Sequence, residues 1–386
     1  MKHFIPYGRQ WIDDDDRRAV GNVLKSDFIT QGPVVAEFEE IIRKRTGAKY
    51  CVAVANGTAA LHIAVQALQI PRGKTGITSP ITFVASANCL LYNGLKPAFA
   101  DIDVKIYNID PAKIAKKITR STSLIIPVHF AGQPADMKEI HRIARKRGCH
   151  IIEDAAHAIG SRYENGHPVG NCEYSDMTIF SFHPVKTVTT GEGGAVTTNN
   201  EDLYRRLLML RTHGITKDPS VMTQNPGPWY YEMHDLGFNY RLTDIQAALG
   251  ISQMKRLDPY IERRRDIVAR YNQAFRNENW AVIPYERPGV LSAFHLYVLQ
   301  IDFDKIGKTR KDVMEALKKK NIGTQVHYIP VHTQPYYRKH LKFRTSDFPI
   351  AEAFYTRALS LPLYPRMTNA DVAYVIRNLK KIVKGK

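Results

Sequence analysis

Short apolar runs alternate with segments of helical period over residues 50–200. The runs include YCVAVA, SLIIPVHF, HIIEDA and MTIFSF, and the segments between them include GTAALHIAVQAL and PADMKEIHRIARKRG. Continuous apolar strands separated by amphipathic helices are typical of a mostly parallel sheet with helices on both faces. The pattern therefore predicts an α/β fold. Because ligands of such sheets bind beyond the carboxyl ends of the strands, we expect the chemistry in the loops that follow the strands.

The pattern changes after Asn200. EDLYRRLLMLRTHG is typical of a helix, and the following stretch over residues 215–235, rich in Pro, Gly and aromatic residues, is expected to be a loop that covers the site. A long helical segment is predicted from about Thr243, with a kink or break at Pro259. We therefore expect a large α/β domain over residues 1–255 and a smaller C-terminal α+β domain over residues 256–386.

Composition narrows the class of protein. With 386 residues and 44% hydrophobic composition, the chain can bury a large core. No apolar run approaches the roughly 18 to 20 residues that a membrane helix needs, and the opening MKHFIPYGRQWIDDDD lacks the apolar centre of a signal peptide. We therefore expect a cytoplasmic protein that does not bind membranes. The four cysteines are scattered without a CxxC pair, so free buried thiols are expected.

Charge indicates an anionic ligand or a basic solvated surface. Lys plus Arg number 55 against 37 Asp plus Glu, a formal net charge of +18. The basic residues are spread through helical segments such as IARKRG and ALKKKN, without interleaved aromatic residues. This distribution disfavours nucleic acid as the partner and favours phosphorylated small molecules.

Several loops at predicted strand ends hold residues suited to a small-molecule site. NGTAAL places Gly57 and Thr58 between a strand and a helix, where free amides and a hydroxyl can hold an anion, although an ordinary turn has the same pattern. Phe83 in SPITFVASAN could equally be a core residue or a ring-stacking partner. IIEDAAHAIG ends a strand in Asp154, with His157 one helical turn further. A buried acid needs a partner, which can be structural or a cationic ligand atom.

Lys186 shifts the balance between these interpretations towards a ligand site. FSFHPVKTVTTGEGG places this lysine in a tight loop between two apolar runs, where an amine can act as a reagent. An anion cradle, a flat aromatic platform, an acid with a cationic partner and an activatable amine together describe a site for pyridoxal phosphate. No single feature is specific, but the ordered set is.

The chain resembles the DegT-type family of sugar-nucleotide aminotransferases, which have the fold of the type I pyridoxal-phosphate enzymes. The resemblance covers essentially the whole chain and is carried by FITQGPVVAEFE, NGTAAL, SPITFVASAN, PVHFAGQPADM, EDAAHAIG, FSFHPVKTVTTGEGG, GFNYRLTDIQAALG and HYIPVH. It implies a PLP-dependent transferase fold of type I. The expected architecture is a mostly parallel central sheet with helices on both faces, plus a smaller C-terminal α+β domain.

The resemblance also implies roles for individual residues. Lys186 would bond to the cofactor aldehyde, and Asp154 would pair with the pyridine nitrogen. The implied cofactor contacts are Gly57, Thr58, Ala59, Phe83, Asp154, His157, Ser181, Lys186 and Asn239. Among them, Ser181, Thr58 and the Ala59 amide would bind the phosphate, Phe83 would stack on the ring and His157 would lie near the ring hydroxyl. Asn239 would act on the neighbouring subunit's cofactor, which implies a homodimer with shared sites, and His327 would lie near the sugar.

Within the family, SFHPVK joined to TTGEGG and the opening FIPYGRQWIDDDD resemble the branch that acts in pseudaminic acid biosynthesis. This branch transfers the amino group of L-glutamate to the C4 ketone of a UDP-4-keto-6-deoxy-N-acetylhexosamine. Alternatives are a 3- or 4-aminotransferase for another UDP-, dTDP- or GDP-linked ketosugar, or a non-enzymatic regulator on the same fold. Sugar dehydratases of the family have histidine in place of the lysine, so Lys186 argues against that branch.

Two further patterns have simpler interpretations. His327 and His332 in HYIPVH could suggest a metal pair, but no acidic or cysteine ligand stands near them in sequence, so no metal is expected. The acidic run from Asp13 to Asp16 could bind divalent cations, yet acids directly before RRAVGNVLKS are typical of a helix N-terminus.

Overall fold

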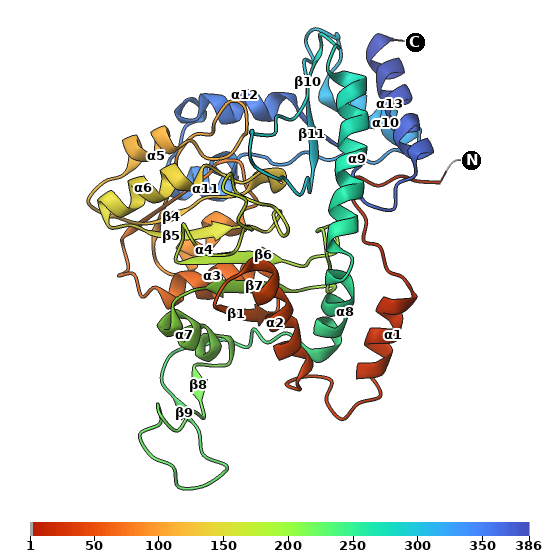
Figure 1. Ribbon diagram of the computed structural model, residues 1–386. Coiled ribbons are helices and arrows are strands. Elements are labelled where there is room, and N and C mark those ends of the chain that lie inside the picture. Colours follow the sequence, from red (N-terminus) through yellow and green to blue (C-terminus); the bar gives the residue numbers. More distant parts are fainter. Residues whose placement is uncertain (1–2, 386) are drawn as a thin grey trace.

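Seven strands form the central sheet of the computed structural model, which describes residues 3–385 (Figure 1). The strand order is β1-β7-β6-β5-β4-β2-β3. Strands β2 to β6 pair in parallel, whereas β7 pairs antiparallel with both β1 and β6. The predicted mostly parallel sheet is confirmed. The strands are β1 (Tyr50–Val54), β2 (Thr75–Thr78), β3 (Lys96–Phe99), β4 (Thr122–Ile126), β5 (His150–Asp154), β6 (Met177–Ser181) and β7 (Gly194–Thr198).

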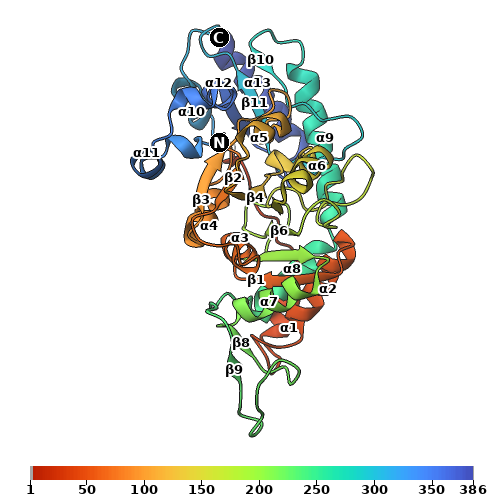
Figure 2. The same cartoon turned by 90° about the vertical axis from the view of Figure 1, so that its left-hand side faces the viewer.

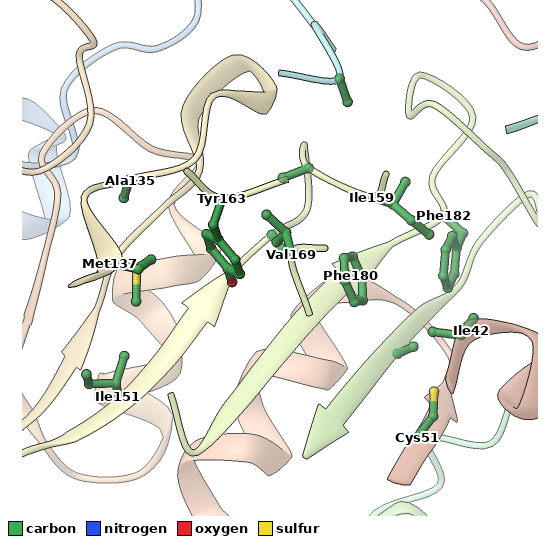
Figure 3. Close-up of a cluster of buried hydrophobic side chains, with 14 of the residues drawn as sticks. Ile42, Cys51, Ala135, Met137, Ile151, Ile159, Tyr163, Val169, Phe180 and Phe182 are labelled. Atoms are coloured by element: carbon green, nitrogen blue, oxygen red, sulfur yellow. The ribbon is translucent and has the colours of Figure 1, made fainter. Parts of the chain in front are cut away.

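Helices cover both faces of this sheet, as the apolar pattern predicted. One face packs on α2 (Val34–Thr46), α5 (Pro111–Lys117), α6 (Met137–Arg147) and α8 (Asp244–Met254). The other packs on α3 (Gly57–Ala67), α4 (Ala85–Tyr92) and α7 (Glu201–Arg211). Figure 3 shows side chains of the first cluster, in which Ile151 of β5 and Phe180 of β6 lie on the same side of the sheet. The residues that follow them, Ile152 and Ser181, therefore face the opposite side.

Several helices begin where the sequence supplies a capping side chain. Asp13 caps α1 (Asp14–Val23) in a reciprocal capping box with Asp16, so the acidic run is a helix start as predicted. Both carboxylates also pair with Arg256. Thr243 caps α8 in the same way. The long helical segment expected after Thr243 is divided, and Pro259 lies in the first turn of the second helix, where its missing N–H leaves no intrahelical bond unmade.

A second sheet is built from the C-terminal part of the chain. It is antiparallel, in the order β10 (Ala281–Val282), β11 (Tyr297–Ile301) and β12 (Ala358–Leu361). The helices around it are α9 (Leu257–Phe275), α10 (Arg310–Lys319), α11 (Pro335–Leu341), α12 (Pro349–Arg357) and α13 (Asn369–Lys384). Ile5 packs into the core of this unit. The predicted division at residue 255 falls between α8 and α9, and the two-domain description stays a proposal.

An apolar cluster joins the two sheets. Short 3-10 turns lie in the loops of both parts: η1 (Phe130–Gly132), η2 (Val331–Thr333) and η3 (Thr345–Asp347). Phe99 and Phe130 from the loops and strand ends of the large sheet pack in one cluster with Leu296 and Val331 from the C-terminal part. Residues of the C-terminal part therefore pack over the carboxyl edge of the large sheet.

The segment over residues 215–235 is a protruding hairpin rather than a wholly irregular loop. Its base is β8 (Ile215–Thr216) paired antiparallel with β9 (Glu232–Met233), and it extends away from the body of the chain in both views (Figures 1 and 2). Trp229, Met233 and Leu236 are among the most exposed large apolar side chains that the structure describes. An apolar extension of this kind marks a surface suited to contact with another molecule.

The cysteines and the helices agree with the sequence-based expectations. All four cysteines are free and buried, as predicted: Cys51, Cys89, Cys149 and Cys172. Over residues 3–385, no helix combines the length and apolar character that crossing a bilayer requires. The cytoplasmic location stays a prediction.

A buried carboxylate fastens the beginning of α2 to α8. Asp244 is fully buried at the first position of α8. Its carboxylate accepts hydrogen bonds from the amides of Gly32 at 2.7 Å, Val34 at 2.8 Å and Val35 at 3.3 Å. Pro33 offers α2 no capping side chain, so Asp244 supplies that acceptor from a distant part of the chain.

We expect Asp244→Ala to lower the free energy of unfolding by about 2–4 kcal/mol, because three amide donors lose a charged acceptor in a buried place. Urea unfolding followed by circular dichroism measures the change. Asp15→Ala is the matched control: its carboxylate pairs with Arg18 at the exposed surface, and its loss should change stability by about 0.5 kcal/mol or less. Equal effects of the two substitutions would contradict this anchoring role.

Candidate active site

A cavity of about 970 Å³ opens at the carboxyl edge of the large sheet. It is lined by residues that follow several different strands and by residues of the C-terminal part. With one exception, the residues expected to form the site all line it: Gly57, Thr58, Ala59, Phe83, Asp154, His157, Ser181, Lys186 and His327. The exception is Asn239, whose neighbour Tyr240 lines the cavity instead.

The N-terminus of α3 forms one wall of the cavity. Asn56 caps this helix, and its Oδ1 accepts the Ala59 amide at 2.8 Å. The predicted contact between the Ala59 amide and a phosphate therefore competes with the cap, and the amides of Gly57 and Thr58 are better placed to meet an anion. A Cβ on Gly57 would lie 2.9 Å from the Ser181 Cβ, so glycine is needed for this approach. Amides and hydroxyls together make an anion cradle.

Asp154 faces the cavity from the end of β5. Only 5% of its surface is exposed, and its carboxylate accepts the Ser86 hydroxyl at 2.6 Å and the Ala156 amide at 3.1 Å. Both donors are neutral, and no cation among the described residues is hydrogen-bonded to or ion-paired with this carboxylate. A protonated ligand nitrogen is the kind of partner that such a buried charge needs.

Lys186 lies in the turn between β6 and β7. Its amide donates to the His183 carbonyl at 2.8 Å, which fixes the turn. Burial of the amine lowers the pKa of Lys186 from 10.5 to about 8, and the nearby charge of Asp154 opposes this shift. A lysine with such a pKa has a substantial neutral fraction near pH 8, and the neutral amine is the nucleophilic form.

Burial keeps three of the histidines that border the cavity neutral: His157, His295 and His327. His157 accepts the Ala131 amide on Nδ1 at 3.3 Å and lies 3.0 Å from the Tyr328 hydroxyl through Nε2. Burial, with a contribution from Lys186, lowers the pKa of His157 well below its usual value and that of His327 to about 3. The same causes, together with the neighbouring His157, lower the pKa of His295. These three imidazoles carry no positive charge, and Lys186 is the one lysine among the described residues that line the cavity.

Phe83 presents its ring to the cavity. The side chain is 58% exposed, and its ring centroid lies 6.2 Å from that of Tyr328. It is therefore not a core residue, which was the alternative left open by the sequence. An exposed aromatic face at the cavity wall is suited to stack on a flat ring.

Asn239 lies on the surface, outside the cavity of its own chain. It forms an isolated bridge with Thr212 beside α7. None of the cavity-lining residues comes from the segment 215–235, so the expected covering loop does not cover the site of its own chain. The predicted action of Asn239 across a subunit interface is compatible with this placement and stays a prediction.

Sequence reasoning missed several residues of the cavity wall. Tyr7 comes from the N-terminal segment, with its ring 5.3 Å from that of His327. His295 comes from the loop directly before β11, with its ring 4.4 Å from that of His157. Tyr328 directly follows His327 in HYIPVH, and this adjacency was the one available signal. The other two lie far from any motif in sequence.

The structure separates the two histidines that could have formed a metal pair. His327 Nδ1 lies 2.8 Å from the Ser360 hydroxyl, whereas His332 Nε2 lies 2.7 Å from a Glu352 carboxylate oxygen. Within the described part of the chain, no group of three His, Cys, Asp or Glu side chains is placed to hold a metal ion.

Solved structures share this architecture along its whole length. The aminotransferase PseC of Helicobacter pylori, involved in the biosynthesis of pseudoaminic acid, superposes with a TM-score of 0.92 at 30% identity, covering 99% of this chain and 100% of that one. The putative sugar aminotransferase Spr1654 of Streptococcus pneumoniae superposes in its PLP form with a TM-score of 0.91 at 29% identity, covering 99% of each chain. Fold and cavity thus define the class, a transaminase of the α/β type, and confirm the predicted fold.

Sequence comparison gives the family. The spore coat polysaccharide biosynthesis protein SpsC of Bacillus subtilis is 42% identical over 384 residues, which cover 99% of this chain and 98% of that protein. The model of the DegT/DnrJ/EryC1/StrS aminotransferase family matches residues 10–380. The chain belongs to this family, which confirms the resemblance seen in its motifs.

The residues present fit the cofactor of this class. Spr1654 has been solved in both PLP and PMP forms, which agrees with the predicted pyridoxal phosphate. In this chain the α3 N-terminus and Ser181 suit its phosphate, Phe83 its ring, Asp154 its ring nitrogen and Lys186 its aldehyde. All of these residues line one cavity.

The lowered pKa of Lys186 gives a pH prediction. In the protein without cofactor, covalent labelling of Lys186 should rise with pH with a midpoint near 8, because only the neutral amine reacts. In Asp154→Asn the midpoint should fall further, since the lost negative charge had favoured the ammonium form. Mass spectrometry of the labelled peptides follows both, with the other lysines as internal reference. A midpoint that rises in Asp154→Asn would contradict the electrostatic coupling.

Proposed function

We propose that the protein is a PLP-dependent sugar-nucleotide aminotransferase that moves the amino group of L-glutamate to the C4 ketone of a UDP-4-keto-6-deoxy-N-acetylhexosamine. The product would be UDP-4-amino-4,6-dideoxy-N-acetyl-β-L-altrosamine, an intermediate of pseudaminic acid biosynthesis. The observation that carries the transaminase part is the meeting of Lys186, Asp154 and the α3 N-terminus in one cavity. The likeness to PseC supports the choice of sugar.

The roles of the residues follow from their positions. Bound pyridoxal phosphate supplies an electron sink that stabilises negative charge on the substrate carbon. Asp154 would hold a proton on the pyridine nitrogen of the cofactor, since a buried carboxylate favours a cationic neighbour. Lys186 would hold the cofactor aldehyde, and its amine, when free of that bond, would accept the α-proton of glutamate and return a proton when the amino group passes to the sugar. Its pKa of about 8 suits both directions near neutral pH.

Substrate recognition is assigned to the opposite wall of the cavity. His327 and Tyr7 pack together there, with ring centroids 5.3 Å apart, on the side formed by the C-terminal part. We place the sugar against this wall. Glutamate leaves as 2-oxoglutarate, and the ketosugar accepts the amino group in its place.

The proposal includes a homodimer with composite sites. Asn239 and the apolar hairpin over residues 215–235 lie outside the cavity of their own chain, and closed two-fold symmetry is the common way to bring such surfaces to a second site. Asn239 would then reach the phosphate of the partner's cofactor.

Substrate choice is tested by kcat/KM for a panel of UDP-, dTDP- and GDP-linked ketosugars with glutamate as donor. We expect the UDP-linked 4-ketosugar to be preferred by about 5- to 150-fold, because a polar group left unpaired in the pocket costs about 1–3 kcal/mol. NMR of the product fixes the amine position. The chain is more similar in sequence to SpsC than to PseC, so another ketosugar is the competing outcome. A preference of the enzyme for that ketosugar would overturn the proposed substrate and leave the transaminase assignment intact.

Subunit complementation tests the composite site. Lys186→Ala and Asn239→Ala should each be inactive or weak alone, and mixing them under subunit exchange should restore up to about a quarter of wild-type activity, since one site of each mixed dimer carries neither lesion. The control mixture is Lys186→Ala with Asp154→Asn, whose lesions lie in the same site. Equal behaviour of the two mixtures, with exchange demonstrated by mass spectrometry, would refute the shared site.

A further inference from the structure

Tyr328 is a cavity residue for which neither the motifs nor the proposed roles provide a task. Its ring lines the cavity and is held between other rings, with centroids 4.9 Å from His327, 6.2 Å from Phe83 and 6.4 Å from Phe130. Its hydroxyl lies 3.0 Å from His157 Nε2. The ring is thus fixed by packing and the hydroxyl by one hydrogen bond.

The direction of that hydrogen bond follows from the other nitrogen of His157. The Ala131 amide, which can only donate, donates to Nδ1 at 3.3 Å. Nδ1 therefore bears a lone pair, and the imidazole hydrogen must sit on Nε2. Burial keeps His157 neutral, in agreement with this tautomer. His157 consequently donates from Nε2 to the Tyr328 oxygen, and the phenolic hydrogen is not used by this contact.

Among the described residues, no partner other than His157 lies within hydrogen-bond distance of the Tyr328 hydroxyl. Burial and the charge of Asp154 raise the pKa of Tyr328, so the hydroxyl keeps its hydrogen over the working pH range. A chain of donors thus runs in one direction, from the Ala131 amide through His157 to Tyr328, and ends at the cavity.

We propose that Tyr328 donates its phenolic hydrogen to an electron-rich oxygen of the molecule bound in the cavity, and that His157 is the positioning residue that aims it. The inference rests on the proposed function. A carboxylate, ketone or phenolate-type oxygen fits this donor, whereas an ammonium group or an amide N–H does not. Two sources can supply the oxygen: the ring oxygen of the cofactor and the polar groups of the substrates.

The test compares Tyr328→Phe with wild type, using the full chain loaded with pyridoxal phosphate. If the oxygen belongs to the cofactor, binding of pyridoxal phosphate to the apo protein should weaken by about 10-fold or more. The pH midpoint of the visible absorbance should then rise, because the lost donor had stabilised the deprotonated chromophore. If the oxygen belongs to a substrate, both cofactor readouts should stay at wild-type values, and kcat/KM for glutamate or for the ketosugar should fall by about 10- to 100-fold.

Control variants separate this role from a structural one. Tyr337→Phe removes a phenol hydroxyl that donates to Asn88 Oδ1 at 2.7 Å outside the cavity. This variant should leave cofactor binding, the pH midpoint and kcat/KM at their wild-type values. Glutamine retains a donor and an acceptor. His157→Gln should therefore change the affected measurement less than Tyr328→Phe does. His157→Leu combined with Tyr328→Phe should cost less than the sum of the two single effects.

Two results overturn the inference in distinguishable ways. If Tyr328→Phe binds pyridoxal phosphate and turns over both substrates within twofold of wild type, this inference alone is overturned. Failure of wild-type protein to form a borohydride-reducible adduct with pyridoxal phosphate on Lys186 overturns it together with the proposed function.

Discussion

The alternation of side chains along β5 places two adjacent buried carboxylates on opposite faces of the sheet, and the site depends on this separation. Glu153 is surrounded by donors: His129 at 2.8 Å, Tyr163 at 2.6 Å, Ser175 at 2.5 Å and Thr178 at 3.1 Å. These bonds hold the pKa of Glu153 below its usual value despite its burial. The Glu153 carboxylate is thus fully engaged by hydrogen bonds within the protein. The Asp154 carboxylate, one residue further, faces the cavity and can meet a ligand.

Close backbone approach gives the anion cradle its position relative to Asp154. A Cβ on Gly194 would lie 2.5 Å from the Asn56 carbonyl oxygen, and a Cβ on Gly57 would collide with Ser181. Two glycines therefore let the N-terminus of α3 rest directly on the ends of β6 and β7. Lys186 lies in the turn that joins these two strands, so cradle, acid and amine are fixed by the same small part of the sheet.

The sequence predicted the residues that follow strands and missed those that arrive from elsewhere. Gly57, Asp154 and Lys186 could be found because the carboxyl ends of strands meet at one edge of a parallel sheet. Tyr7 and His295 could not, since their places depend on how the C-terminal part packs against that edge, and no local pattern encodes this packing. The predicted hydrogen bond from the Ala59 amide to the phosphate did not take the helix cap into account. The same amide donates to Asn56 Oδ1, so the cap and the ligand compete for it.

The cavity also holds less positive charge than its proposed ligands require. Lys186 is the one lysine or arginine among the described residues that line it, and burial keeps His157 and His327 neutral. A cofactor phosphate and a nucleotide diphosphate would together bring several negative charges. The helix end of α3 compensates about half a charge. Although the chain as a whole carries a formal net charge of +18, that charge lies outside the cavity wall of a single chain. This balance supports the proposed homodimer, in which a second copy would supply further positive charge to the site.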